Sequence, residues 1–491
     1  MTGDELGKNH WYGDAAATGK GPREDDPGVR RPDPRDETSF EWARAGVRGL
    51  RWNMKRLSLC LGLLAPMGFL WACTGDDDVY RPTDAGAFET STPDQSAPPG
   101  PDGSGSEPLA CGDAGDAPPR VLLLQGGATA SELAAVNLTT NAVDGRLPVE
   151  GPYGTTSSLG TDPYVLGGES DQVIRLDARE PWKPVATWNV RGDDGLPDGD
   201  PNANPVAVVQ TSCNKAYVLR YNRDRIAVID PSNAAGGAPT KYIDLAPLKQ
   251  AGDPNMVEMT SAVYVPAKKR VYVLLGNIDF TNYVQVDNYP YLLCTNLKPA
   301  IIAIDVDTDQ VVSLGGTAPG GGIALEGYNP PLGSPLVYDA SADRLLVLQA
   351  GCNTDPGDGG VGAMTRRRVE QVDLATGAVK TLLSLDDKSF PSSLAYASGE
   401  HAAVAFGFEG YYWDPRQTTL GPVIEGGLDL VASDGRGGFL GTHQIYFGDG
   451  GTGPLRVLSV PTADAGPKLI TENPFTKAGG YVAAIEAWPH P

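Results

Sequence analysis

Histidine is scarce in this chain. Only His10, His401, His443 and His490 occur in 491 residues, so a copper or zinc centre built on several imidazoles is not expected. The sequence also lacks a G-x-S-x-G segment, which argues against a serine hydrolase of that type. Its cysteines form no C-x-x-C pair of the kind found in zinc and redox sites.

Basic residues are outnumbered. The chain has 39 Lys and Arg residues against 61 Asp and Glu residues, which gives a net charge of -22. A nucleic-acid partner is therefore not expected, because Lys and Arg are needed to neutralise phosphates. The acidic excess favours solubility and allows cation binding without specifying either. Helical periodicity of useful length is also lacking after residue 120, so the core is expected to be almost all-β.

Short apolar runs separated by turn residues recur along the chain instead. Asn204–Leu245 contains four of them, and a repeat of this size indicates an array of small sheets rather than one large sheet. The second and third strands of successive copies are predicted at Val121–Leu124 and Leu133–Asn137, Tyr164–Gly167 and Val173–Asp177, Ala216–Leu219 and Ile226–Asp230, Val271–Leu275 and Ile301–Asp305, Leu345–Gln349 and Val369–Asp373, Ala402–Phe406 and Tyr411–Trp413, and Gly438–Gly441 and Leu455–Val460. Four of the third strands end at an aspartate, which starts a turn by accepting hydrogen bonds from the backbone two residues on.

A first strand is predicted upstream of every copy except the earliest one. These strands are Thr156–Gly160, Val206–Val209, Ser261–Val265, Ser334–Tyr338, Ser392–Tyr396 and Asp429–Ala432. The C-terminal segment Tyr481–Trp488 can supply the missing strand of the first copy, which would close a ring and remove two sheet edges. The sequence thus predicts a single β-propeller of seven four-stranded blades over residues 120–491. A β-sandwich, or a ring of six or eight blades, is the alternative.

The repeat resembles that of the bacterial YVTN-type seven-bladed β-propellers. Ala216–Tyr221 followed by Arg225–Asp230 (AYVLRY, then RIAVID) is the closest match, and Val271–Val273 with Ile302–Asp305 matches more loosely. The resemblance implies a fold. Because the family is functionally mixed, it implies no activity.

A segment near the N-terminus has the pattern of a bacterial lipoprotein signal. Residues 54–72 begin with Lys55 and Arg56 and continue through an apolar run of 14 residues, Leu57–Leu70, which is short for a membrane span. The run ends in Leu-Trp-Ala-Cys, which resembles a lipobox with Cys73 as the lipid-bearing residue. The resemblance implies cleavage before Cys73, acylation (palmitate included) and a destination at the outer membrane or cell surface. An uncleaved signal anchor, or a buried core segment, is the alternative.

Two segments around this signal are expected to carry no fold. Residues 1–53 are rich in Gly, Arg and Asp and precede a signal that belongs at an N-terminus, so they are interpreted as a gene-model extension or as disordered chain. Residues 73–119 are rich in Asp, Pro, Gly and Ser and are expected to form a lipid-anchored, disordered tether. A coil of this length spans roughly 35–40 Å.

Four cysteines remain outside the signal and the lipobox. An even number in an exported protein suggests two disulfides. Cys294 and Cys352 lie in long insertions after the second strands of neighbouring blades, on one face of a propeller, so they are expected to pair. Cys111 and Cys213 would then pair by elimination. Buried free thiols are the alternative.

One acidic loop suggests a metal. Asp193, Asp194, Asp198 and Asp200 place four carboxylates within eight residues, and hard cations such as Ca²⁺ prefer oxygen-rich loops. The spacing is not that of an EF-hand, and a solvated acidic turn is the alternative. Calcium is therefore a hypothesis, and no other cofactor is predicted.

The insertions Asn277–Pro299 and Gly351–Arg368 are the predicted binding region. The first carries Phe280, Tyr283, Tyr289 and Tyr291, and aromatic side chains supply contact area at little entropic cost. The second ends in Arg366, Arg367 and Arg368 at the start of a third strand. The alternatives are that the rings pack onto their own blade and that the arginines form an exposed strand edge.

The sequence thus predicts a cell-envelope lipoprotein, held at the membrane by its lipid anchor. Its propeller would bind or scaffold a protein or an envelope polymer on the face with the insertions, with no catalytic residue assigned. The alternative is an enzyme: a propeller lactonase or hydrolase that uses carboxylates at the central channel, with or without calcium. A convergent cluster of Asp and Glu at one channel mouth would favour the enzyme.

Overall fold

The structure is a computed structural model, and it describes the later part of the chain with gaps. The described residues are 112, 114–127, 130–151, 154–157, 162–192, 202–253, 256–286, 289–357, 360–406, 409–424, 427–434, 436–442, 455–458, 468–471, 474–476 and 481–489. The predicted extension, signal, lipid site Cys73 and most of the tether lie outside this set. So do Cys111 and the acidic loop with Asp193, Asp194, Asp198 and Asp200.

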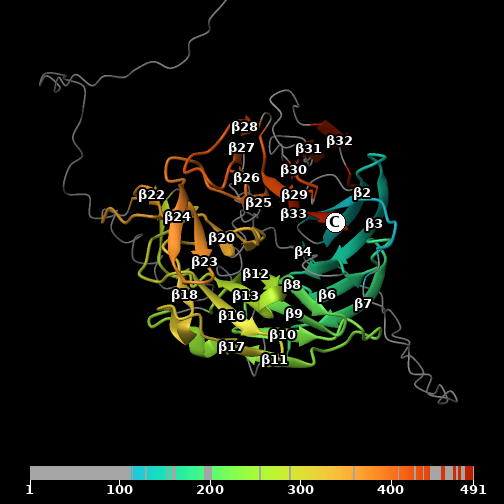
Figure 1. Ribbon diagram of the computed structural model, residues 1–491, viewed down its shortest axis with the longest axis horizontal. Coiled ribbons are helices and arrows are strands. Elements are labelled where there is room, and N and C mark those ends of the chain that lie inside the picture. Colours follow the sequence, from blue (N-terminus) through green and yellow to red (C-terminus); the bar gives the residue numbers. More distant parts are fainter. Residues whose placement is uncertain are drawn as a thin grey trace, which may run out of the picture. The chain divides into compact units, whose positions relative to one another are not determined.

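The strands of the described residues form six four-stranded sheets and one five-stranded sheet. The first two sheets along the chain are β4 (Gly154–Ser157), β5 (Tyr164–Gly167), β6 (Gln172–Leu176) and β7 (Pro184–Asn189), and then β8 (Pro205–Ser212), β9 (Lys215–Arg220), β10 (Arg225–Ile229) and β11 (Lys241–Asp244). The five-stranded sheet follows, with β12 (Met259–Val265), β13 (Arg270–Leu275), β16 (Ala300–Asp305), β17 (Gln310–Val312) and the added β18 (Ile323–Ala324). The next two sheets are β19 (Val337–Asp339), β20 (Arg344–Gln349), β23 (Arg368–Asp373) and β24 (Val379–Ser384), and then β25 (Ser393–Ser398), β26 (His401–Ala405), β27 (Gly410–Trp413) and β28 (Val423–Ile424). The other two are β29 (Leu430–Ser433), β30 (Phe439–Thr442), β31 (Leu455–Leu458) and β32 (Lys468–Thr471), and β33 (Tyr481–Trp488), β1 (Arg120–Gly126), β2 (Ala130–Asn137) and β3 (Val143–Glu150). Figure 1 shows these sheets arranged around a common centre, so the protein is an all-β, single β-propeller with four-stranded blades.

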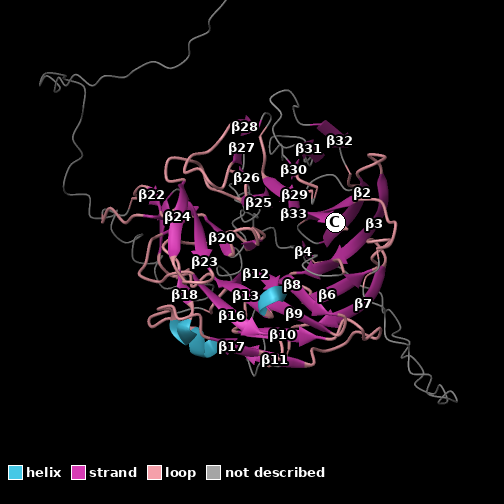
Figure 2. Ribbon diagram, in the orientation of Figure 1, coloured by secondary structure: helices cyan, strands magenta, loops and turns pink. Residues whose placement is uncertain are grey.

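Little else is regular in the described part of the chain. Two hairpin pairs lie outside the blades, β14 (Tyr283–Val286) with β15 (Tyr289–Leu292) and β21 (Cys352–Asn353) with β22 (Met364–Thr365). The described residues include three short 3₁₀ turns, η2 (Ala246–Leu248), η3 (Pro266–Lys268) and η4 (Pro319–Gly321) (Figure 2). None of the described helices has the length and apolar character of a membrane span.

The strand order within each blade follows the predicted repeat. Every predicted second and third strand falls on an adjacent pair in one sheet, from β1 and β2 to β30 and β31. The edges differ slightly: β19 begins three residues later than expected, and β23 begins at Arg368, so Arg366 and Arg367 precede the third strand. The chain also contacts its blade before residue 120, because Pro119 accepts a hydrogen bond from the Leu138 amide at 2.9 Å.

The aspartates after the third strands form the expected turns. Asp230 Oδ1 accepts a hydrogen bond from the Ser232 amide at 2.9 Å, and Asp373 Oδ1 accepts one from the Ala375 amide at 3.0 Å. Hydrogen bonds from the Thr376 side chain and backbone hold the pKa of Asp373 below its usual value. Asp177 and Asp305 make equivalent contacts. These turns fix where each fourth strand starts.

The middle strands are buried on both faces because each blade packs between two others. In β9 and β10 every residue after the first is buried. The outer strands β3 and β7 instead alternate between exposed and covered positions, as expected for a sheet edge with one solvated face. The largest core cluster joins two blades, with Tyr217 and Leu219 of β9 packed with Val271 of β13.

Serine hydroxyls on inner strands connect neighbouring blades. Ser157 Oγ donates to the Val208 carbonyl at 2.8 Å and accepts from the Val208 amide at 3.0 Å. Ser393 Oγ donates to the Val431 carbonyl at 2.9 Å in the same way. Both serines are nearly fully buried. Each bond satisfies backbone groups at a junction where two inner strands do not pair.

A buried carboxylate adds a polar link between the β8–β11 and β12–β18 blades. Asp309 accepts hydrogen bonds from Lys215, Lys241 and Tyr217. Burial alone would raise the pKa of Asp309, but these three donors outweigh burial and keep the pKa below its usual value. The acid is therefore ionised at neutral pH and holds two lysines at one blade junction.

The C-terminal strand joins the first blade. β33 pairs with β1 in antiparallel register from Arg120 opposite Trp488 to Gly126 opposite Tyr481. Trp488 is 3% exposed, and its indole Nε1 donates to the Ala178 carbonyl at 2.8 Å. The predicted strand Tyr481–Trp488 thus has the predicted bounds and the predicted neighbour.

Replacing Trp488 by Ala is expected to destabilise the propeller by about 3–5 kcal/mol, because it removes a large buried side chain and leaves the Ala178 carbonyl without its indole donor. The loss in the free energy of unfolding is measured by denaturant titration, with backbone circular dichroism as the signal because the substitution removes a tryptophan. Val423, which is 56% exposed, supplies the control, since Val423→Ala is expected to change stability by less than about 0.5 kcal/mol. Equal effects of the two substitutions would contradict a stabilising role for β33.

Candidate binding surface

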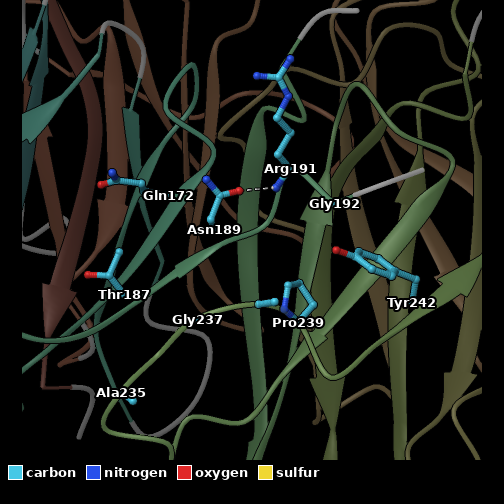
Figure 3. Close-up of a pocket in the computed structure, with 10 residues that line it drawn as sticks. Gln172, Thr187, Asn189, Arg191, Gly192, Ala235, Gly237, Pro239 and Tyr242 are labelled. Atoms are coloured by element: carbon cyan, nitrogen blue, oxygen red, sulfur yellow. Dashed lines mark hydrogen bonds between the residues drawn. The ribbon is translucent and has the colours of Figure 1, made fainter. Parts of the chain in front are cut away.

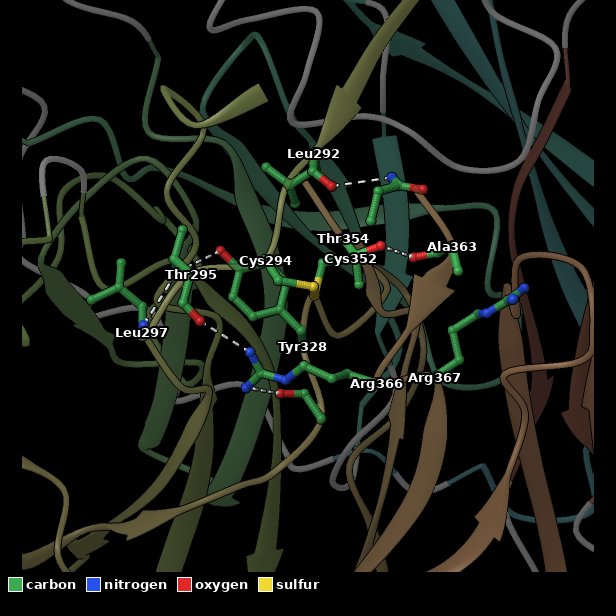
Figure 4. The surroundings of a disulfide bond; sticks show 12 residues. Leu292, Cys294, Thr295, Leu297, Tyr328, Cys352, Thr354, Ala363, Arg366 and Arg367 are labelled. Carbon is green, nitrogen blue, oxygen red and sulfur yellow. Dashed lines mark hydrogen bonds between the residues drawn. A yellow bond between two sulfur atoms is a disulfide. The ribbon is translucent and has the colours of Figure 1, made fainter. Parts of the chain in front are cut away.

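The two insertions form one structure, which we call the insertion platform (Asn277–Pro299 with Gly351–Arg368). Cys294 and Cys352 are joined by a disulfide with a Cα–Cα distance of 5.0 Å, the pairing expected from the sequence (Figure 4). The backbones are paired as well: the Cys294 amide donates to the Asn353 carbonyl at 2.9 Å, and Asn353 Nδ2 donates to the Leu292 carbonyl at 3.1 Å. Loops from neighbouring blades are thereby fixed to each other. Cys213 is also disulfide-bonded, and its expected partner Cys111 lies outside the described residues.

Arg366 holds the platform to the blades beneath it. Its guanidinium donates to the carbonyls of Thr295 at 3.1 Å, Glu326 at 3.0 Å and Gly327 at 3.0 Å. It also lies over the ring of Tyr328, 5.1 Å from the ring centroid (Figure 4). Burial lowers the pKa of Arg366, yet a guanidinium stays charged at neutral pH. These charge-assisted bonds connect both insertions with the loop before β19.

The other two arginines of the triplet differ in their surroundings. Arg367 is buried, with its backbone amide 2.9 Å from Asp386 Oδ1 and its guanidinium donating to the Asp386 carbonyl at 2.5 Å. Arg368 is half-buried on β23, and its guanidinium reaches Thr381 Oγ1 at 3.5 Å. Two of the three arginines predicted to bind a partner therefore bind the protein's own backbone.

The aromatic residues of the first insertion are divided between two faces. Phe280 packs within the platform, against Ile278, Cys352 and the neighbouring Tyr328. On the hairpin, Tyr283 pairs with Leu292 and Tyr291 pairs with Val284, so Tyr283 and Tyr291 point to opposite faces. Because Leu292 packs with the Phe280 cluster, Tyr291 is the ring directed away from it. The side chain of Tyr289 lies outside the described residues.

Glu258 is a buried acid next to the platform. It precedes β12 with a φ of 43°, is 3% exposed, and accepts a hydrogen bond from the Ile278 amide at 2.8 Å. Burial raises the pKa of Glu258 well above its ordinary value, and the charges of Asp253 and Asp224 add to the rise. Among the described residues, no group of three His, Cys, Asp or Glu side chains is placed to hold a metal ion.

A pocket of about 860 Å³ lies between the outer strands of the β4–β7 and β8–β11 blades (Figure 3). It forms because the β10–β11 loop lies against β7, where the Gly237 amide donates to the Thr187 carbonyl at 2.9 Å. Gly236 permits this approach: its φ is 62°, and a Cβ there would lie 1.9 Å from the Thr187 oxygen. The glycine pair Gly236–Gly237 in the loop sequence AAGGAP is a sequence signal for this close approach.

No protein-family model and no curated protein matches the chain. Solved structures that it resembles include hydrazine synthase of Kuenenia stuttgartiensis (16% identity, TM-score 0.46, covering 70% of this chain and 95% of that chain). A second is AztD from Citrobacter koseri, solved in its apo form (11%, TM-score 0.43, 76% and 99%). A third is a 6-phosphogluconolactonase candidate from Bacteroides fragilis (10%, TM-score 0.44, 76% and 98%). Identities and scores this low transfer no function.

Replacing Arg366 by Met should loosen the platform, because three backbone carbonyls lose a charged donor while the side-chain volume is largely kept. Hydrogen–deuterium exchange in β14, β15, β21 and β22 is expected to speed up by at least about tenfold, the equivalent of one lost charge-assisted bond. Arg368→Met is the matched control from the same triplet and should leave these amides unchanged. Slow exchange in both variants would show that the disulfide alone holds the insertions.

Proposed function

We propose that this chain is a lipid-anchored binding module of the cell envelope and that its partner docks on the insertion platform. The observation that carries the proposal is the disulfide between Cys294 and Cys352, reinforced by Arg366, which joins two insertions from different blades. Rigid surfaces bind with a smaller loss of conformational entropy than mobile loops do. The blades themselves do not require the platform, since the β4–β7 and β8–β11 blades form without such insertions between their second and third strands.

We also propose seven blades of the YVTN type, closed by the C-terminal strand. The proposal is supported by six four-stranded sheets and one five-stranded sheet among the described residues, and by the pairing of β33 with β1. Neighbouring inner strands, such as β4 beside β8 and β8 beside β12, are consistent with a ring without a gap. In a closed ring the unpaired inner edges face the central channel, where other chains reach them less easily.

The partner we favour is a protein or an envelope polymer that contacts the outward face of the β14–β15 hairpin. Among the described side chains, Tyr291 is an aromatic one on that face, and a tyrosine offers apolar area with a polar tip. The alternative function is a lactonase or hydrolase acting with carboxylates. Glu258 is the observation that favours it, because burial raises the pKa of its carboxyl and so favours the protonated form that a general acid needs.

Crosslinking of the tagged full-length protein in cells, followed by mass spectrometry, tests the platform. One abundant envelope partner is expected, and Tyr291→Ala should reduce its yield by about tenfold, as for a central aromatic contact. Tyr411→Ala, a half-buried tyrosine on β27 of another blade, is the control and should leave the yield unchanged. No partner above background, or an equal loss in both variants, would contradict the proposal and direct attention to Glu258.

Lipid anchoring is tested separately at Cys73. The variant Cys73→Ala is expected to lose fatty-acid labelling and to move from the membrane fraction to the soluble fraction, because the proposed acyl chains are what retain the protein there. Cys60→Ala is the matched control, since this cysteine lies in the proposed signal and would be removed with it. Membrane retention of Cys73→Ala would contradict the lipobox interpretation.

A further inference from the structure

The pocket between the β4–β7 and β8–β11 blades has an unusual lining for this protein. None of the ten described residues that line it is Asp or Glu, although the chain carries 61 acidic and 39 basic side chains. Its polar side chains include Gln172, Thr187 and Asn189, which come from β6 and β7 (Figure 3). Tyr242 and Pro239 form an apolar wall on the other side. Amide and hydroxyl groups facing an aromatic wall suit a ligand that presents both hydroxyls and a hydrophobic ring face.

Two arginines lie at the rim of the pocket and behind its aromatic wall. The exposed Arg191 lies at its rim, directly after Asn189, whose Oδ1 accepts the Arg191 amide at 3.0 Å. Arg220 is fully buried behind the wall, with its guanidinium 4.6 Å from the centroid of the Tyr242 ring. Arg220 donates to the carbonyls of Val190 at 3.1 Å and Arg191 at 3.0 Å, which fixes the backbone that carries the rim.

The Arg191 guanidinium remains accessible to a ligand. Within the described residues no hydrogen bond or ion pair joins the Arg191 side chain to a carboxylate. The charge of Arg191 does act on Asp171. The pKa of Asp171 is raised by burial, and Arg191 is one of several groups that partly offset this rise. The Asp171 carboxylate is nevertheless occupied, since Oδ1 accepts the Ala203 and Asn204 amides at 2.6 and 3.3 Å. Among the described residues no carboxylate is paired with the Arg191 guanidinium, so this group suits an anionic ligand.

We infer that this pocket binds an acidic oligosaccharide, with a sugar carboxylate on Arg191, sugar hydroxyls on Gln172, Thr187 and Asn189, and a sugar ring against Tyr242. A metal ion does not fit, because the lining offers no carboxylate ligand. The pocket is open to solvent rather than enclosed, so it can hold one segment of a longer polymer. The site is on other blades than the insertion platform, and the inference does not depend on the proposed docking there.

Isothermal titration calorimetry of the full chain at low salt tests the inference. It compares the binding of tetragalacturonic acid with the binding of maltotetraose, a neutral tetrasaccharide. The acidic sugar is expected to bind and the neutral one to bind at least tenfold more weakly. Arg191→Gln should weaken binding of the acidic sugar at least tenfold by removing the guanidinium. Ala238→Trp should do the same by filling the pocket at an exposed loop position.

Arg436→Gln is the matched control, because Arg436 is an exposed arginine on another blade and its loss changes the net charge equally. Its affinity should stay within twofold of the parent. The inference is overturned if tetragalacturonic acid gives no binding at millimolar concentration, if maltotetraose binds equally, or if Arg191→Gln matches Arg436→Gln. Loss of binding on adding a calcium chelator would also overturn it, since the neighbouring Asp193–Asp200 segment would then be responsible. Retention of sugar binding in Ala238→Trp would also overturn it, because the filled pocket could not then be the binding site.

Discussion

The pairing of β33 with β1 is the constraint on which the rest of the propeller depends. It brings residues 120 and 488 into one antiparallel register, so the blades between them are held by a contact between the two ends of the fold. Contacts so distant in sequence require a large loss of chain entropy before they contribute. This loss of chain entropy is offset by apolar burial at the blade junctions, where side chains of adjacent sheets form shared clusters.

Polar groups at these junctions are used to satisfy the backbone and to hold neighbouring blades together. Ser157 and Ser393 bond the inner strand of the next blade, and Asp309 gathers donors from the preceding blade. Such buried contacts are costly when incomplete. They therefore specify how neighbouring blades are placed more strictly than apolar packing does, which gives the insertions and the pocket a fixed base. The binding regions lie on this base, in loops whose sequences the blade repeat does not constrain.

The sequence predicted the blades well because the signals were local. Apolar runs of strand length, and an aspartate such as Asp230 after the third strand, determine each unit within about 40 residues. The Cys294–Cys352 pair followed from the repeat, which placed both insertions on one face. The contacts of Arg366 were not predictable in this way. Its acceptors Thr295, Glu326 and Gly327 come from two other loops, and no spacing in the sequence relates them to the arginine triplet.

Arg366 and Arg191 differ in how the protein uses their guanidinium groups. A run of three arginines beside a long insertion suggests a binding patch, yet a guanidinium has five donors, and burial next to carbonyl-rich loops uses them internally. Arg191 stands alone in the segment Asn189–Gly192, which carries no motif. Its surroundings become a pocket because the loop of the next blade brings Pro239 and Tyr242 opposite it, with Arg220 behind the ring. The chemistry of the pocket is thus a property of the blade junction, and neither blade contains it alone.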